Sequence, residues 1–351
     1  MRTLEIAIGN AVERIRELEC RRSMFGGVVS KNQSNILLDG KPIVLPISPK
    51  TIDGMVAAVD GGLLHRNFHG FDLIVGKAVG AVFEYKRSRL VSVEYHPSAF
   101  PAPTPIPVYK PLSQRDSETM AQIKRQELEI QAAIEIAEGF DLEMLLLDGS
   151  VIPHSSTRPH DDSEINEDFH ALLGQFKELY SACSKRKLPL VGIVEDSRGK
   201  RFGDILSKIL PFEMRDEGVL GNTFDTNLLY YILQPGLRTC DFSFSDQPKK
   251  HPILRELGEW SSKARTFYMK SAKYDRPLRI DYINGDAEDI VSKLYPLCEI
   301  NELYGIPSPI IEADARARLS SSEIEVIYNQ LVDKAGELPA LMRLRRDMRP
   351  F

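Results

Sequence analysis

Two aspartates each stand directly after an apolar stretch, and each is followed by glycine. Asp60 ends the string MVAAVD at 55–60, and Asp148 ends EMLLLD within 143–150. Such strings are typical of buried strands, and the carboxyl ends of parallel strands meet at one edge of a sheet. A strand-end Asp-Gly is also common as a plain turn, but two such motifs favour a shared site. We therefore expect the two carboxylates to lie together at that edge.

A predicted helix over 113–139 lies between these strands and carries two further carboxylates, Glu127 and Glu129. Helical spacing does not separate them, because either could turn toward the sheet edge. Two strand-end aspartates and a helical glutamate form an oxygen-only ligand set, which suits Mg²⁺ or Mn²⁺ rather than zinc. Two such ions about 3.5–4 Å apart can activate a water and stabilise the leaving oxygen in phosphodiester cleavage. The predicted chemistry is metal-dependent phosphodiester hydrolysis.

The elements that must position these residues follow in the order β-β-β-α-β-α-β. Strands at 71–85 and 89–96, joined by a short polar connection, predict an antiparallel hairpin after the first strand. The Pro-rich stretch 97–107 predicts a surface connection. We expect further helices at 3–22, 164–186, 201–210, 224–234, 286–295, 311–319 and 321–346. We also expect short β runs within 24–48, and further strands at 188–197 and near 237–245, 265–271 and 277–282.

Composition limits the class of protein. The chain has 351 residues and a formal net charge of -5, which argues against a general nucleic-acid coat protein but leaves a local basic channel open. Its four cysteines have no CxxC spacing and no apolar run reaches about 18 residues, so we expect a cytoplasmic protein with reduced thiols and no membrane span. No GxxxxGKS/T motif occurs, so any ATP-driven movement must come from a partner.

Several strings, taken in order, resemble the NurA nuclease family, whose core is RNase H-like. They are AAVDGG (57–62), RQELEI (125–130), LLLDGS (145–150), VGIVEDSRGK (191–200), FDTNLLYYILQPG (224–236), RTFYMKSAKYDRPLRIDY (265–282) and YGIPSPIIEADARARL (304–319). The resemblance implies an α/β fold, an RNase H-like mixed sheet flanked by helices. We expect an N-terminal helix and small β element over 1–50, the nuclease domain over 51–320 and a helical C-terminal extension over 321–351.

The resemblance also implies a ligand set and an activity. The ligands would be Asp60, Glu129 with Glu127 as the alternate, Asp148, and a late helical residue that is commonly His in the family and is Asp314 here. The implied activity is Mn²⁺- or Mg²⁺-dependent DNA cleavage, of the single-strand endonuclease and 5′–3′ exonuclease type, in DNA end resection and double-strand break repair. The implied partners are DNA, a second copy in a toroidal homodimer, and a hexameric HerA-type translocase.

Basic and aromatic residues indicate where DNA would run. The family tends to have a Lys in the strand-five motif, whereas this motif reads Val-Glu-Asp-Ser and is followed by three cations that could contact phosphates, Arg198, Lys200 and Arg201. Cations and aromatic rings also interleave over 265–282, as a single-strand channel requires. This pattern predicts DNA contacts for Tyr268, Lys270 and Tyr282. For the three cations after strand five, the alternative is a solvated basic turn. For 265–282, the alternative is two strands with ordinary exposed faces.

Two other functions fit parts of the sequence. An actin-like ATPase or sugar kinase uses the same core and also begins with an Asp-Gly motif on its first strand. That function needs a second Gly-rich phosphate loop and an adenosine motif such as a late Gly-Gly pair, and no late Gly-Gly pair occurs here. The other alternative is a non-catalytic clamp that only guides DNA for a translocase. DNA binding without bound metal would favour the clamp.

Overall fold

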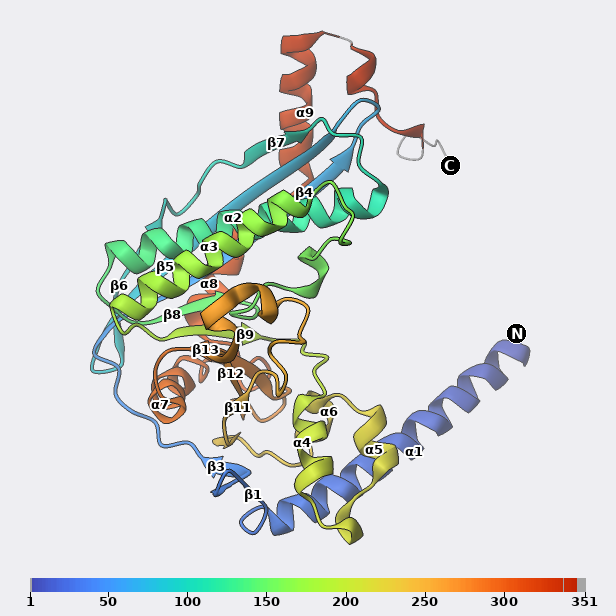
Figure 1. Cartoon of the computed structure of the whole chain (residues 1–351), viewed down its shortest axis with the longest axis vertical. Helices are drawn as coiled ribbons and strands as arrows, with labels where there is room; N and C mark the ends of the chain where they lie inside the picture. The colour runs from blue at the N-terminus through green and yellow to red at the C-terminus, as the bar shows by residue number, and fades with distance from the viewer. Residues whose placement is uncertain (1, 337, 346–351) are drawn as a thin grey trace.

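The computed structural model describes residues 2–336 and 338–345. A mixed sheet with helices on both faces forms its centre (Figure 1). Strand order across this sheet is β3-β10-β12-β13-β9-β8-β4-β5-β6, with β11 beside β12 and β7 beside β5. The mixed α/β sheet flanked by helices that the sequence predicts is therefore confirmed.

The strands next to the predicted site follow the expected order. β4 (Gly54–Asn67), β5 (Asp72–Lys86) and β6 (Arg89–His96) form an antiparallel meander. β8 (Leu142–Asp148) pairs parallel to β4, and β9 (Leu190–Val194) pairs parallel to β8. Part of the Pro-rich stretch expected to be only a surface connection is a strand, β7 (Thr104–Val108), which pairs with the start of β5. Proline is tolerated on such an edge strand because its missing N–H can face solvent.

Beyond β9 the sheet continues with antiparallel strands. These are β13 (Leu278–Ile283), β12 (Arg265–Lys270), β11 (Phe242–Ser243), β10 (Leu237–Thr239) and β3 (Val44–Pro46). β3 comes from the N-terminal β element, so that element contributes a strand to the central sheet. A separate two-stranded ribbon is formed by β1 (Leu37–Leu38) and β2 (Lys41–Pro42).

The two faces of the sheet are covered by different helices, as the alternation of side chains along β4 requires. Ala57 and Val59 belong to the cluster that includes α2 (Gln114–Gly139) and α3 (Asn166–Lys185). Val56 and Ala58 belong to the opposite cluster, with α7 (Ala287–Leu297) and α8 (Ser308–Ala317). Ser113 caps α2 by accepting a hydrogen bond from the backbone N–H of Asp116.

The N-terminal helix is longer than the sequence pattern predicts. α1 spans Arg2–Asn32, so the GGVVS segment expected to be β-like is helical. Phe25 and Val29 lie one helical turn apart and are buried in a third cluster with the short helices α4 (Arg201–Ile209), α5 (Glu217–Asn222) and α6 (Asp225–Leu229). Burial of this pair outweighs the weak helix propensity of the segment. The N-terminal half of α1 projects from the body (Figure 1).

Two helices are shorter than expected. The helix predicted over 224–234 is only α6, followed by turns, and the helix predicted over 321–346 is α9 (Ser321–Ala335). A capping box at Ser320 begins α9, and Gly336 ends it with a positive φ of 74°. Residues 346–351 of the predicted extension lie outside the described residues. Short 3₁₀ turns occur at Ser155–Thr157, Phe212–Met214, Leu254–Ser262 and Pro339–Leu341. None of the described helices is long and apolar enough to cross a membrane.

Candidate active site

Asp60 and Asp148 lie where the parallel part of the sheet stops. β4 runs on to Asn67, so the expectation that its strand ends at Asp60 is wrong. Its parallel pairing with β8 nevertheless ends at Val59 opposite Leu147, and only the antiparallel partner β5 continues beyond. Both aspartates are therefore at the carboxyl edge of the parallel strands, where the sequence pattern places them.

The glycines after Asp60 allow two helices to approach the strand closely. A Cβ at residue 61 would lie 2.5 Å from Cγ of Glu129 on α2. A Cβ at residue 62 would lie 2.0 Å from the carbonyl oxygen of Ala317 on α8. Neither glycine has a positive φ, so close packing, and not a turn, requires glycine at both positions.

The two glutamates of α2 face different surroundings. Glu129 is 7% exposed, and its Oε1 lies 2.9 Å from Nη1 of Arg125, which also donates to the Gly61 carbonyl. Glu127 is paired instead with Lys124, which in turn bonds Asp168 on α3. Glu129, and not Glu127, is therefore the helical carboxylate beside Asp60.

The three carboxyl groups disfavour each other's ionised forms. Burial, together with the charges of Asp60 and Asp148, raises the pKa of Glu129 to about 8 against the opposing charge of Arg125. Burial also raises the pKa of Asp60 and of Asp148, and a protonated Asp148 donates a hydrogen bond to Asp60. Like charges gathered in a poorly solvated place cause such shifts, and a bound cation would relieve them.

Asp314 completes one side of this group. It lies on α8 and is exposed, and its charge raises the pKa of Asp60. Its nearest cation is Arg318, 3.7 Å away and one turn further along the helix. Because Gly62 lets α8 approach β4, the position of Asp314 depends on that close contact. The structure thus brings together the four acids that the sequence singled out.

One further carboxylate at the site was not selected from the sequence. Glu195 follows β9, is half-buried, and its charge raises the pKa of Asp148. It accepts hydrogen bonds from the hydroxyl of Tyr304 at 3.3 and 3.4 Å. Burial and the charges of Glu195, Asp314 and Asp148 raise the pKa of Tyr304 to about 12. The sequence signal that could have identified Glu195 is its place in the strand-five motif, because β9 ends at the same sheet edge.

The residues present fit a hard divalent cation. All the clustered donors are carboxylate oxygens, the ligands that Mg²⁺ and Mn²⁺ prefer. Oε1 of Glu129 is fully buried and accepts no hydrogen bond of normal geometry from the described residues, which leaves an acceptor for a cation. Within residues 2–336 and 338–345, no three His, Cys, Asp or Glu side chains already stand in a ligating arrangement. The donor chemistry therefore fits the ion, and the described side chains as placed do not surround one.

A buried polar network supports the loop that follows Asp148. Ser150 donates a 2.7 Å hydrogen bond to Asp281, which is fully buried on β13. Asp281 also accepts from the hydroxyl of Thr266 at 2.7 Å and from Nε of Arg279 at 2.9 Å. The residue pattern around Asp281 does not by itself distinguish a buried strand aspartate from an exposed one, so its burial follows from the tertiary structure.

The basic loop after β9 is held by a buried aspartate on α6. Asp225 accepts from the backbone N–H groups of Phe202 and Gly203, both at 2.9 Å, at the start of α4. Among the predicted phosphate contacts in this loop, Lys200 donates to the Gly221 carbonyl and Arg201 pairs with Asp246. Arg198 is exposed and has no ion pair with any described residue.

The structure does not support the predicted DNA contacts on β12 and β13. Tyr268 and Tyr282 are 1% and 3% exposed, so their rings offer no face to a base. Tyr268 donates to Asp225, and Tyr282 donates to Asp241. Lys270 is also buried and lies over the ring of Tyr230. Their burial is therefore incompatible with the predicted DNA contacts of Tyr268, Lys270 and Tyr282.

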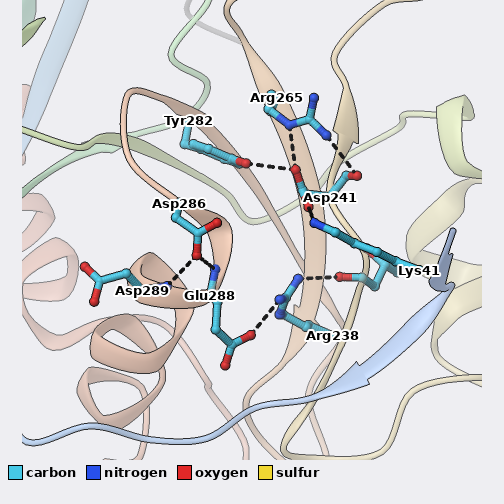
Figure 2. Close-up of polar contacts among 9 residues, drawn as sticks. Lys41, Arg238, Asp241, Arg265, Tyr282, Asp286, Glu288 and Asp289 are labelled. Carbon is cyan, nitrogen blue, oxygen red and sulfur yellow. Dashed lines mark hydrogen bonds and ion pairs between the residues drawn. The ribbon is translucent and has the colours of Figure 1, made fainter. Parts of the chain in front are cut away.

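Figure 2 shows the network that holds Tyr282. Asp241 lies at its centre and accepts from Tyr282 at 3.1 Å and from Nε of Arg265 at 2.6 Å. Lys41, from β2, lies 3.6 Å from the same carboxylate. These contacts tie the N-terminal ribbon to the sheet, so the interleaved cations and rings of 265–282 serve in part as structural links.

Comparison with known proteins decides the family. A family model described as the NurA domain matches residues 54–319. This chain belongs to the NurA family. The NurA nuclease from Sulfolobus solfataricus is similar in fold, with a TM-score of 0.57 at 14% identity, over 97% of this chain and 100% of that chain. A NurA structure bound to dAMP and manganese has a TM-score of 0.54 at 10% identity, over 95% and 99% of the two chains.

These matches confirm the predicted NurA resemblance and the RNase H-like α/β fold. A comparison with curated proteins found no match. At 10–14% identity the NurA structures establish the fold alone.

Proposed function

We propose that this NurA-family chain is a metal-dependent deoxyribonuclease that hydrolyses phosphodiester bonds at the Asp60–Asp148 edge of the sheet. The observation that carries this proposal is the buried Glu129, whose Oε1 lacks a normal hydrogen bond beside two further carboxyl groups. Burying three carboxyl groups together with one cation, Arg125, is unfavourable, and clusters of this kind are typical of functional sites. Family membership and the nuclease activity named for its solved relative support the same function.

We propose Mn²⁺, with Mg²⁺ as the alternative, held by Asp60, Glu129 and Asp148, with Asp314 as a fourth ligand. Solved NurA structures with manganese support this choice of ion. When bound in a two-ion arrangement, the metal supplies Lewis-acid polarisation of the phosphate and a water of lowered pKa.

The chain's own residues prepare the site for this chemistry. Burial and the charges of their neighbours raise the pKa of Glu129 and of Asp148 to about 8, so both groups can exchange a proton for a cation. Arg125 balances part of the negative charge while no substrate is bound. Arg198, exposed and without an ion pair among the described residues, is the best placed of the loop cations to contact a phosphate.

A cleavage assay with matched variants tests this function. Wild-type protein is incubated with end-labelled single-stranded DNA in Mn²⁺, in Mg²⁺ or in EDTA. We expect cleavage with metal only, and a loss of about 100-fold or more in Asp60→Asn. Glu127→Gln, on the same helix but paired with Lys124, should cleave normally. Full activity in Asp60→Asn would refute the site, and DNA binding by a wild type that never cleaves would favour the guiding clamp.

The wider biological role that we propose is supported by family membership alone. We propose that the nuclease acts in the cytoplasm in DNA end resection and double-strand break repair, as a homodimer, with a HerA-type hexameric translocase. Exposed apolar side chains on the projecting half of α1, including Leu4, Ile8 and Ile15, are consistent with a protein partner. Light scattering of the purified chain tests the dimer, and co-purification with the translocase tests the partner.

A further inference from the structure

Two loops are joined beside the carboxylates, between β12 and β13 and between α7 and α8. The backbone N–H of Tyr274 donates to the Glu302 carbonyl at 3.0 Å, and that of Gly305 donates to Asp275 at 2.8 Å. Ser271 donates to the Gly305 carbonyl at 2.6 Å. These bonds hold the two loops as one unit, which we call the joined loops (residues 271–276 and 301–306).

The joined loops expose the ring of Tyr304 next to the site. Tyr304 is 44% exposed, and its ring contacts no other aromatic side chain among the described residues. Its hydroxyl donates to Glu195, whose charge acts on Asp148. The hydroxyl is thus fixed on the carboxylate side, while the ring remains open to solvent. An exposed tyrosine anchored by its polar end is pre-organised to bind a flat ligand at little entropic cost.

The surrounding charges identify the part of a DNA strand that fits there. The charges of Glu195, Asp314 and Asp148 act on the hydroxyl of Tyr304, so its surroundings are acidic and disfavour a phosphate. A nucleobase carries no charge and stacks on an aromatic face. Lys273 is exposed on the joined loops and is available for a neighbouring phosphate, whereas Arg276 is exposed but forms an ion pair with Asp196 at 2.7 Å.

Resting on the proposed function, we propose that Tyr304 is the stacking platform for the unpaired nucleobase next to the scissile phosphate. The adjacent Tyr274, 58% exposed and with Lys273 over its ring at 4.9 Å, extends the same surface by one base. A base can lie on Tyr304 only after it has left its neighbours in a duplex. The ring therefore sets which nucleotide is presented to the carboxylates.

Binding without cleavage tests the platform. Single-stranded 12-mers carrying 2-aminopurine at successive positions are titrated with the full chain in EDTA. We expect one position to be quenched by wild type and by Tyr304→Phe, which keeps the ring. In Tyr304→Leu this quenching should disappear and the Kd should rise about tenfold. Tyr109→Leu removes a tyrosine from another segment that is more exposed, at 75%, and should change neither value.

An abasic site gives the second measurement. Placing it at the quenched position should remove the affinity difference between wild type and Tyr304→Leu, because no base remains to stack. Equal Kd values for wild type and Tyr304→Leu on intact DNA would overturn the platform. So would equal losses in Tyr304→Phe and Tyr304→Leu, since the hydroxyl bond to Glu195 would then be responsible. A different result would contradict the proposed function: wild type itself would not cleave DNA with Mn²⁺.

Discussion

Replacing Glu129 by glutamine should stabilise the metal-free protein while it abolishes cleavage. Its carboxyl group is buried, and its pKa is raised from 4.5 to about 8. Keeping such a group protonated at pH 7 costs the folded state up to about 3 kcal/mol relative to an unperturbed carboxyl. Glutamine has the same shape without this cost, but it loses the attraction of Arg125. We expect a net gain of about 1–2 kcal/mol, which raises Tm by about 1–3 °C for a chain of this length.

The pH dependence gives the sign of this effect. Between pH 4.5 and 8 the unfolded chain releases the Glu129 proton and the folded chain retains it, so wild-type stability falls as pH rises through this window. Glu129→Gln has no such proton. Its advantage should therefore be absent below pH 4.5 and grow toward pH 8. Calorimetry at several pH values in EDTA measures this difference directly.

Manganese should reverse the order of stability. An ion present at 100 times its Kd stabilises a folded protein by about 2.7 kcal/mol, and wild type should gain more from it than Glu129→Gln. Glu127→Gln is the matched control and should follow wild type throughout. A Glu129→Gln variant no more stable than wild type at pH 7 in EDTA would refute the reasoning. It would mean that Glu129 is ionised and that its ion pair with Arg125 outweighs its burial.

Three further outcomes can be checked with the same assays. Gly62→Ala should displace α8, lower the free energy of unfolding by about 1–3 kcal/mol and reduce cleavage. Gly139→Ala is the control, because a Cβ there meets nothing within 4 Å, and it should change neither stability nor cleavage. Arg198→Ala should weaken DNA binding equally for all sequences and reduce the salt slope by about 1; an unchanged slope contradicts a phosphate contact. Asp225→Ala should lower stability by about 2–4 kcal/mol in urea unfolding, since two N–H groups at the start of α4 lose their acceptor; unchanged stability would contradict that role.

Local patterns in the chain determine much of the fold. Alternation of apolar residues in 55–60 places Ala57 and Val59 on one face and Val56 and Ala58 on the other, and the structure has this arrangement. The apolar strings before Asp60 and Asp148 place both carboxylates at one sheet edge for the same local reason. The order of strands and helices follows from runs of a few residues, because secondary structure depends on neighbours within one or two turns.

Contacts between distant segments decided the rest. Glu127 and Glu129 have equivalent sequence surroundings, and only the packing of α2 on Gly61 and α3 separates them. Tyr268 and Tyr304 are both tyrosines in strings that resemble the family, yet one is enclosed by the sheet and the other is exposed beside the carboxylates. Burial depends on which surfaces meet after the chain has folded. A pattern of neighbouring residues therefore determines the element on which a side chain lies, and only the tertiary structure decides whether that side chain meets solvent, the core or the site.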